Sequence, residues 1–128
     1  MEFPPPCPEI PVDDLNAALA CYRDRLGFAV DWAEDSIGLA GVSRGSARMF
    51  LSTPAFRAPL GISGPVLLWL NLASRAEVDA LHAEWAAAGA SIEGPPGTRP
   101  YHKLYEFFAR DVDGNTFRVF YDYGWETR

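Results

Sequence analysis

A chain of 128 residues, of which 48% are hydrophobic and 22% charged, has the size and composition of one globular domain, and this excludes a disordered or fibrous protein. A formal net charge of −6 argues against a nucleic acid as partner. Cys7 and Cys21 are too few for a disulfide framework, and no apolar run approaches the length of a membrane span. We therefore expect a cytoplasmic protein that binds neither nucleic acid nor membrane.

The first half of the chain predicts a strand, a helix and three further strands. Residues 7–12 alternate weakly and contain two prolines, which is typical of an edge strand or an arm. Asp13 and Asp14 stand where a helix needs its N-cap, apolar residues follow at helical spacing, and Gly27 is placed to end the helix. Short apolar or alternating runs separated by Asp, Ser and Gly then predict strands at residues 28–33, 38–43 and 47–51.

The second half predicts the same order of elements. Residues 52–65 hold three prolines and two glycines and predict a connecting loop, and the apolar run 66–73 predicts a buried strand. Ser74 and Glu77 form a capping box for a second helix, which Gly89 ends. A short strand, a loop rich in glycine and proline, and a hairpin are expected at residues 91–93, 94–100 and 105–121.

The two halves therefore repeat one pattern within a single domain of residues 1–128. Strands covered by a helix on one face leave the other face free, so two curved units side by side would enclose a groove for a ligand. The predicted fold is α+β, with two tandem βαβββ modules that form a curved mixed sheet around a groove and contribute one helix each. The expected parts are module one (residues 5–53), a linker (54–64), module two (65–123) and a short C-terminal tail.

The hairpin turn at residues 111–115 carries Asp111, Asp113 and Asn115, which superficially suggests a calcium loop. A calcium loop places its glycine sixth and its bidentate acid twelfth, whereas Gly114 is fourth here and an apolar strand follows. Aspartate, glycine and asparagine are also the residues that tight turns prefer. Turn formation explains these side chains better than metal binding does.

Three stretches resemble the vicinal oxygen chelate superfamily, which contains glyoxalase I, the extradiol dioxygenases, fosfomycin-resistance enzymes and the bleomycin-resistance proteins. They are residues 8–15 (PEIPVDDL), 21–28 (CYRDRLGF) and 110–115 (RDVDGN). The two stretches of the first half and the one of the second half occur in the order and spacing expected for this superfamily, so the resemblance covers nearly the whole chain. It implies two tandem βαβββ modules and a homodimer.

The metal positions of this superfamily are altered in the chain. Metal-using members carry a ligand, commonly His, about seven residues before the capping Asp of the first helix, and Cys7 stands there. The equivalent position in the second half is Leu67, and the C-terminal metal Glu is replaced by Arg118. A guanidinium has no lone pair for a cation and repels it. These departures predict that the protein uses no metal and no other cofactor.

Without a metal, the resemblance implies the bleomycin-resistance type, which sequesters a planar or aromatic small molecule, an antibiotic being one candidate, in crevices at a dimer interface. Strand parity places Trp69 and Asn71 on one face with Leu67. The same parity places Phe120 on one face with Arg118, and all of these are expected to line the groove. Looser candidates for its walls or rim are Trp32, Phe50, Tyr101, His102 and Trp125.

Arg118 leaves the ligand's charge open. It is expected either to pair with Glu9 or Glu106 or to attract an anionic or carbonyl-rich ligand. The alternative function is a lyase or isomerase of the same superfamily, metal-dependent or working through acid–base side chains. The candidates for that chemistry are Glu9, Tyr101, His102 and Glu106.

Overall fold

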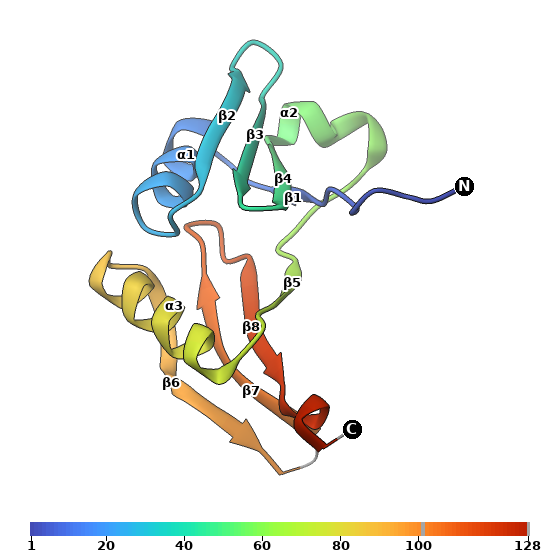
Figure 1. Cartoon of the computed structure of the whole chain (residues 1–128). Coiled ribbons are helices and arrows are strands. Elements are labelled where there is room, and N and C mark those ends of the chain that lie inside the picture. The colour runs from blue at the N-terminus through green and yellow to red at the C-terminus, as the bar shows by residue number, and fades with distance from the viewer. Residues whose placement is uncertain (101, 128) are drawn as a thin grey trace.

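Each half of the chain folds into a four-stranded mixed sheet with one long helix on one face (Figure 1). The computed structural model describes residues 1–100 and 102–127. The first module consists of β1 (Glu9–Pro11), α1 (Leu15–Asp24), β2 (Ala29–Glu34), β3 (Leu39–Arg44) and β4 (Ala47–Ser52). The second consists of β5 (Leu67–Asn71), α3 (Arg75–Ala87), β6 (Ser91–Arg99), β7 (His102–Arg110) and β8 (Thr116–Asp122). The predicted α+β fold of two tandem βαβββ modules is confirmed.

The two sheets share one topology, with strand orders β1-β4-β3-β2 and β5-β8-β7-β6. In each, the first strand of the module runs parallel to the last, and the other neighbours are antiparallel. The last strand of each module is therefore an inner strand. Because β8 lies between β5 and β7, side chains on β8 have neighbours on both sides.

The helix ends follow the predicted capping. The Asp14 carboxylate accepts the N–H of Ala17 at 2.9 Å, and the Ser74 hydroxyl accepts the N–H of Glu77 at 3.1 Å. Gly27 and Gly89 follow the two helices at φ of 73° and 82°, in the left-handed region that favours glycine. No helix within residues 1–100 and 102–127 is long and apolar enough to cross a membrane.

Two segments differ from the prediction. The connection expected as a plain loop contains the short helix α2 (Pro54–Arg57) and the 3₁₀ turn η1 (Ala58–Leu60). The expected loop at residues 94–100 belongs mostly to β6, whose pairing with β7 shifts register between Glu93 and Gly97. β6 is the edge strand of its sheet and has a neighbour on one side only. Its prolines, which lack a backbone N–H, are therefore tolerated there, whereas an inner strand would lose hydrogen bonds to its neighbours. The last element is a 3₁₀ turn, η2 (Tyr123–Thr127).

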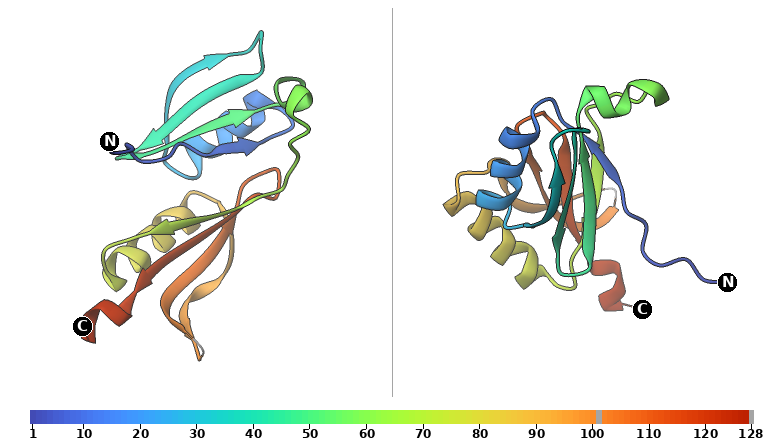
Figure 2. Two further views of the ribbon diagram at one scale, coloured as in Figure 1. Left: turned by 90° about the vertical axis from the view of Figure 1, so that its right-hand side faces the viewer. Right: turned by 90° about the horizontal axis from the view of Figure 1, so that it is seen from above.

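Both helices lie on the same side of the two sheets, so both sheets leave their other face open on the opposite side (Figure 2). Alternate residues of the inner strands, such as Leu51 on β4 and Phe117 on β8, are buried beneath the helices. The intervening residues belong to the open faces. The open faces thus lie side by side on one surface of the chain.

The turn between β7 and β8 joins the two modules and lies against the first of them (Figure 1). The buried Asp111 carboxylate accepts the hydroxyl of Tyr22 from α1 at 2.8 Å. The side-chain amide of Asn115 donates to the carbonyl of Pro11 at 2.8 Å, and its oxygen accepts the N–H of Val66 at 2.9 Å. The turn residues therefore hold the modules together in addition to closing the hairpin.

Burial and the neighbouring Asp111 carboxylate raise the pKa of Tyr22 well above its ordinary value. The phenol therefore stays protonated and remains a donor to Asp111. A second joint lies at the end of α1, where the carbonyl of Leu26 accepts from Trp85 Nε1 of α3 and from Arg44 Nη1, both at 2.9 Å. Arg44 also forms an ion pair with Glu84 of α3, at 2.6 Å.

Candidate functional site

The open face of the second sheet brings an arginine against two aromatic rings. Trp69 on β5 is in register with Arg118 on β8, which is in register with Phe108 on β7. The Arg118 guanidinium carbon lies 4.3 Å from the centre of the Trp69 ring and 5.1 Å from that of Phe108. The Trp69 and Phe120 rings meet edge to face at 5.3 Å. A cation between aromatic rings is a favourable arrangement that also holds the rings in place.

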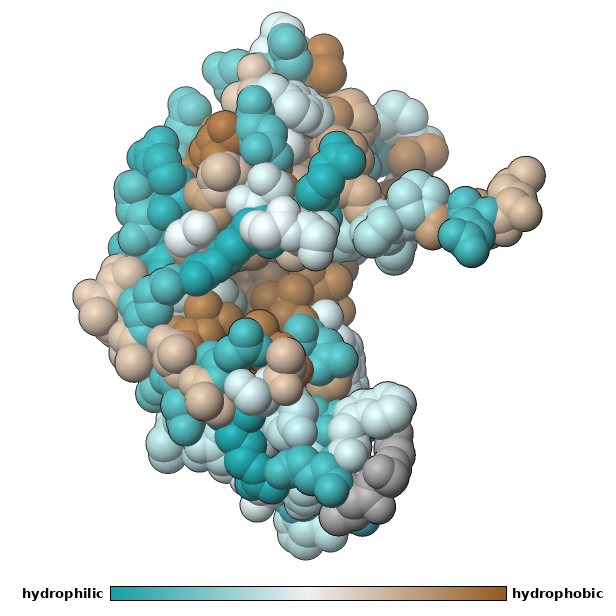
Figure 3. All heavy atoms as spheres, viewed as in Figure 1, coloured by the Kyte–Doolittle hydropathy of each residue, from teal (hydrophilic) through white to brown (hydrophobic). Residues whose placement is uncertain are grey.

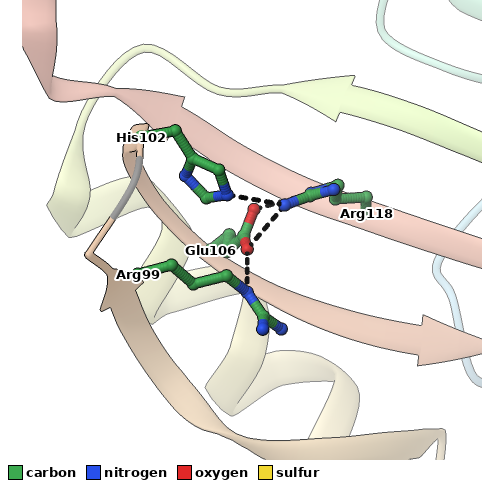
Figure 4. Close-up of polar contacts among 4 residues, drawn as sticks. All are labelled: Arg99, His102, Glu106 and Arg118. Carbon is green, nitrogen blue, oxygen red and sulfur yellow. Dashed lines mark hydrogen bonds and ion pairs between the residues drawn. The ribbon is translucent and has the colours of Figure 1, made fainter.

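The same arginine belongs to an ionic cluster that spans three strands (Figure 4). Arg118 donates to both oxygens of Glu106, from Nε at 2.7 Å and from Nη2 at 2.9 Å. Arg99 at the end of β6 donates to Glu106 at 2.8 Å. Arg118 Nη2 also lies 3.2 Å from His102 Nε2. Since a guanidinium has only donors, this His102 nitrogen must accept.

Glu106 is the buried centre of this cluster. Its side chain is only 3% exposed, against 15% for Arg118 and 45% for Arg99. Burial raises the pKa of Glu106, but hydrogen bonds from Arg118 and then Arg99 outweigh burial, so the pKa lies below its ordinary value. The carboxylate is therefore ionised at neutral pH and engaged by two cations.

The open face of the first sheet carries a separate group. The Trp32 and Phe50 rings lie 5.7 Å apart. A side chain at Gly41 would place its Cβ 2.6 Å from Trp32 Nε1, so glycine is what lets this indole lie against the strand. The Glu9 carboxylate accepts the hydroxyl of Ser52 at 3.0 Å, and β1, which carries Glu9, belongs to a different sheet from β8, which carries Arg118.

The predicted site residues thus fall into two groups. The second sheet brings together Trp69, Asn71, His102, Glu106, Arg118 and Phe120, whereas the first sheet holds Glu9, Trp32 and Phe50. His102 lies on β7, because this strand begins at residue 102 and not at residue 105, where the hairpin was predicted to begin. Trp125 lies in η2, after the end of β8, and Tyr101 lies outside the described residues.

Two residues that contact Glu106 or Arg118, namely Arg99 and Phe108, were not among the predicted site residues. Arg99 was assigned to a loop, so no face could be given to it. Phe108 stands two residues after Glu106 on the same strand, and the period of two that placed Trp69 would have placed Phe108 on the open face as well.

Trp69 also stands at the edge of a hollow between the modules. A cleft of about 610 Å³ lies between the β3–β4 turn, β5 and α3, and it is lined by Trp69, Asn71, Leu72 and Leu81 among others. A second hollow of about 460 Å³, beside the residues that precede β1, also reaches Trp69. Figure 3 shows an indentation between the modules with hydrophobic residues on its floor. A further hollow of about 640 Å³ at the start of α1 contains none of the predicted site residues.

The residues at the superfamily's metal positions do not fit a divalent cation. Cys7 precedes β1, Leu67 offers no donor atom, and Arg118 places a cation on the open face. Glu106, the carboxylate beside Arg118, already accepts three hydrogen bonds from two guanidinium groups. Within residues 1–100 and 102–127, no three His, Cys, Asp or Glu side chains gather where a metal could be held.

Comparison with known proteins agrees with this fold. A profile of the Glyoxalase/Bleomycin resistance protein/Dioxygenase superfamily matches residues 7–119. Lactoylglutathione lyase from Agrobacterium tumefaciens is 24% identical, with a TM-score of 0.77 over 94% of this chain and 96% of that one. The bleomycin-binding protein from bleomycin-producing Streptomyces verticillus, solved with copper(II)-bleomycin, is 27% identical, with a TM-score of 0.70 over 93% and 96%.

TioX from Micromonospora sp. ML1 is 20% identical, with a TM-score of 0.68 over 90% of this chain and 93% of that one. A search of curated proteins found no match. The profile match spans most of the chain, and the two-module fold agrees with it. The chain therefore belongs to the glyoxalase/bleomycin resistance protein/dioxygenase superfamily.

Proposed function

We propose that the protein is a metal-free small-molecule binding protein that sequesters a planar or aromatic ligand on the open face of its second sheet. The observation that carries this proposal is the position of Arg118, held by Glu106 beneath the half-exposed ring of Trp69. An ordered indole over a fixed cation offers a flat apolar surface and a polar anchor, as ligand sites do. Similarity to the bleomycin-binding protein supports sequestration of a small molecule, and an antibiotic with a planar group is one candidate for this ligand.

The contacts of Glu106 favour binding over acid–base catalysis. A general base has to reach a substrate proton and exchange protons near neutral pH. Glu106 is buried, and hydrogen bonds from Arg118 and Arg99 hold its pKa below the ordinary value. It therefore serves as the structural anchor of the two arginines.

We further propose that a second copy of the chain covers the open faces and completes the groove. Leu67 and Trp69 are 51% and 49% exposed on edge strand β5, and Trp32 is 37% exposed on the first sheet. Exposed apolar side chains gathered on one surface are typical of an interface. In light scattering after size-exclusion chromatography, we expect twice the mass of one chain.

The variant Leu67→Glu should lower this mass toward that of a monomer, because it places a charge in the proposed interface. Ile37→Glu is the matched control, as Ile37 is equally exposed at 51% but lies in the β2–β3 turn. A monomeric wild-type protein would overturn the dimer proposal. An unchanged dimer of the Leu67 variant would show that this part of the face does not form the interface.

Ligand stacking is tested by Trp69→Ala. We expect the affinity for a planar probe such as anthracene-9-methanol to fall by about 1–3 kcal/mol, as on truncation of an aromatic anchor, while the circular-dichroism spectrum and melting temperature stay near the wild-type values. Affinity is measured by quenching of tryptophan fluorescence and by calorimetry. Leu60→Ala is the control, because Leu60 is a comparably exposed apolar side chain (66%) that lies in η1, on the connection between the modules. Equal affinities of both variants would contradict a role for Trp69.

A further inference from the structure

We propose that the ligand of the second sheet's open face is a planar aromatic acid, whose carboxylate or comparable oxyanion binds Arg118 while its ring stacks beside Trp69. This inference rests on the proposed binding function and names the charge of the ligand. It runs against the charge of the whole chain, which is −6 and favours cationic ligands at long range.

Two cations of the ionic cluster pair with the same anion. Glu106 contributes one negative charge, whereas Arg99 and Arg118 contribute two positive charges. Arginine stays protonated under all ordinary conditions, and the pKa of Glu106 lies below its ordinary value, so this count holds at neutral pH. Two guanidinium groups thus share one carboxylate in the cluster.

Arg118 has hydrogen-bonding capacity left for a ligand. Its Nε and Nη2 are used by Glu106 and His102. Among the hydrogen bonds of the described residues, none is made by its Nη1, and the side chain is 15% exposed. Because Glu106 and two rings fix the guanidinium, a ligand oxyanion would gain a preorganised donor at little cost in side-chain entropy.

Two other acids of the second sheet, Asp122 and Glu93, have partners of their own. Asp122 follows Phe120 on the same face of β8, and its carboxylate accepts the N–H of Gly124 at 2.9 Å. Glu93 on β6 pairs with Arg110 at 3.2 Å. Among the described residues, Glu106 is the one acid that pairs with the Arg118 guanidinium.

The test uses three probes with one ring system and different charges: anthracene-9-carboxylate, anthracene-9-methanol and 9-(aminomethyl)anthracene. Dissociation constants are measured by fluorescence and calorimetry at low salt with the intact protein. We expect the carboxylate to bind at least roughly tenfold more tightly than the alcohol, because a hydrogen bond to a charged group is worth at least as much as a tenfold change in affinity, and the ammonium to bind least tightly.

The possible outcomes separate the two proposals. If the alcohol or the ammonium binds as tightly as the carboxylate, the ligand is not an acid, and the binding function itself survives. If none of the three probes binds, the proposed binding function fails together with this inference. If the carboxylate binds most tightly, both are supported.

Two variants trace the preference to the cluster. Arg99→Gln removes a half-exposed cation and leaves Glu106 paired with Arg118, so the fold should persist while the preference for carboxylate over alcohol shrinks several-fold. Arg23→Gln is the control, since it changes the net charge equally but lies on α1, where Arg23 pairs with its neighbour Asp24. Glu106→Gln removes the anion of the cluster and should therefore increase the preference for carboxylate over alcohol. Equal preferences in the Arg99 variant and its Arg23 control would overturn the inference.

Discussion

Replacement of Asp111 by alanine is expected to lower the free energy of unfolding by about 3–4 kcal/mol, because it leaves several buried donors without an acceptor. The Asp111 carboxylate accepts the Tyr22 hydroxyl, the Asp113 N–H, and both the backbone N–H and the side-chain amide of Asn115. Tyr22 and Asn115 are themselves fully buried, so water cannot replace the lost bonds. Denaturation by urea, followed by circular dichroism and by tryptophan fluorescence, measures the change.

The chain offers a matched control for this prediction. Asp79 accepts the hydroxyl of Tyr105 at 2.6 Å, which is also a bond between an aspartate and a tyrosine, but it is exposed and lies within the second module. Asp79→Ala should change the stability by less than about 0.5 kcal/mol. Tyr22→Phe, which removes one donor and leaves the carboxylate its other partners, should cost about 1 kcal/mol. Equal costs for Asp111→Ala and Asp79→Ala would show that the turn does not join the modules.

This joint marks a limit of sequence reasoning. The turn itself was predictable, because aspartate, glycine and asparagine are the residues that tight turns require. Its contact with Tyr22 was not, since the two partners are 89 positions apart and nothing in the local pattern of either residue points to the other. Hydrogen bonds between distant segments follow from the packed fold and leave no periodic signal.

The strands show where local rules compete. Glycine and proline at residues 94–100 indicate a loop in most contexts, yet the segment is largely strand β6 because an edge strand tolerates proline and a register shift absorbs the extra residues. Because residues 94–100 were predicted to be a loop, Arg99 was not predicted as a site residue. By contrast, β5 and β8 pair without a register shift, so the parity that grouped Trp69 with Leu67 and Phe120 with Arg118 holds along both strands.

The ionic cluster was half predictable. Glu106 was one of two acids expected to pair with Arg118, and the structure selects it over Glu9. The choice follows from the sheet, because β7 and β8 are direct neighbours, whereas β1 belongs to the other sheet. Sheet membership is a property of the whole chain, so the sequence pattern of β8 could not decide between the two acids.

Replacement of Arg118 by leucine is expected to lower the free energy of unfolding at pH 7.5 by about 2–3 kcal/mol, because Glu106 then keeps its buried charge with only Arg99 as a cationic partner. Loss of one partner of a buried pair usually costs more than this, and the half-exposed Arg99 is why the expected value is smaller. Chemical denaturation at fixed ionic strength measures the difference from the wild-type protein.

The difference in stability between Arg118→Leu and the wild-type protein should also depend on pH, and this dependence tests the role of Glu106 more directly than the difference at one pH does. In the wild-type protein the pKa of Glu106 is lowered, so its contribution to stability is present above the pKa of the unfolded chain and is lost as the pH falls through the folded pKa. In the variant, burial is no longer opposed by Arg118, and the pKa of Glu106 should rise. A raised carboxyl pKa means that stability falls as the pH increases. The gap between the two proteins should therefore be widest near pH 7 and narrow toward pH 4.

A double variant separates the charge of Glu106 from the loss of packing. Glu106→Gln combined with Arg118→Leu removes the buried charge, so much of the stability at pH 7.5 should return and the dependence on pH between 4 and 7 should largely disappear. If the single and double variants show the same loss at every pH, the arginine acts through its contacts with Trp69 and Phe108 alone. If the difference in stability from the wild-type protein narrows toward pH 4 in the single variant but not in the double variant, Arg118 is the group that keeps Glu106 ionised beneath the open face.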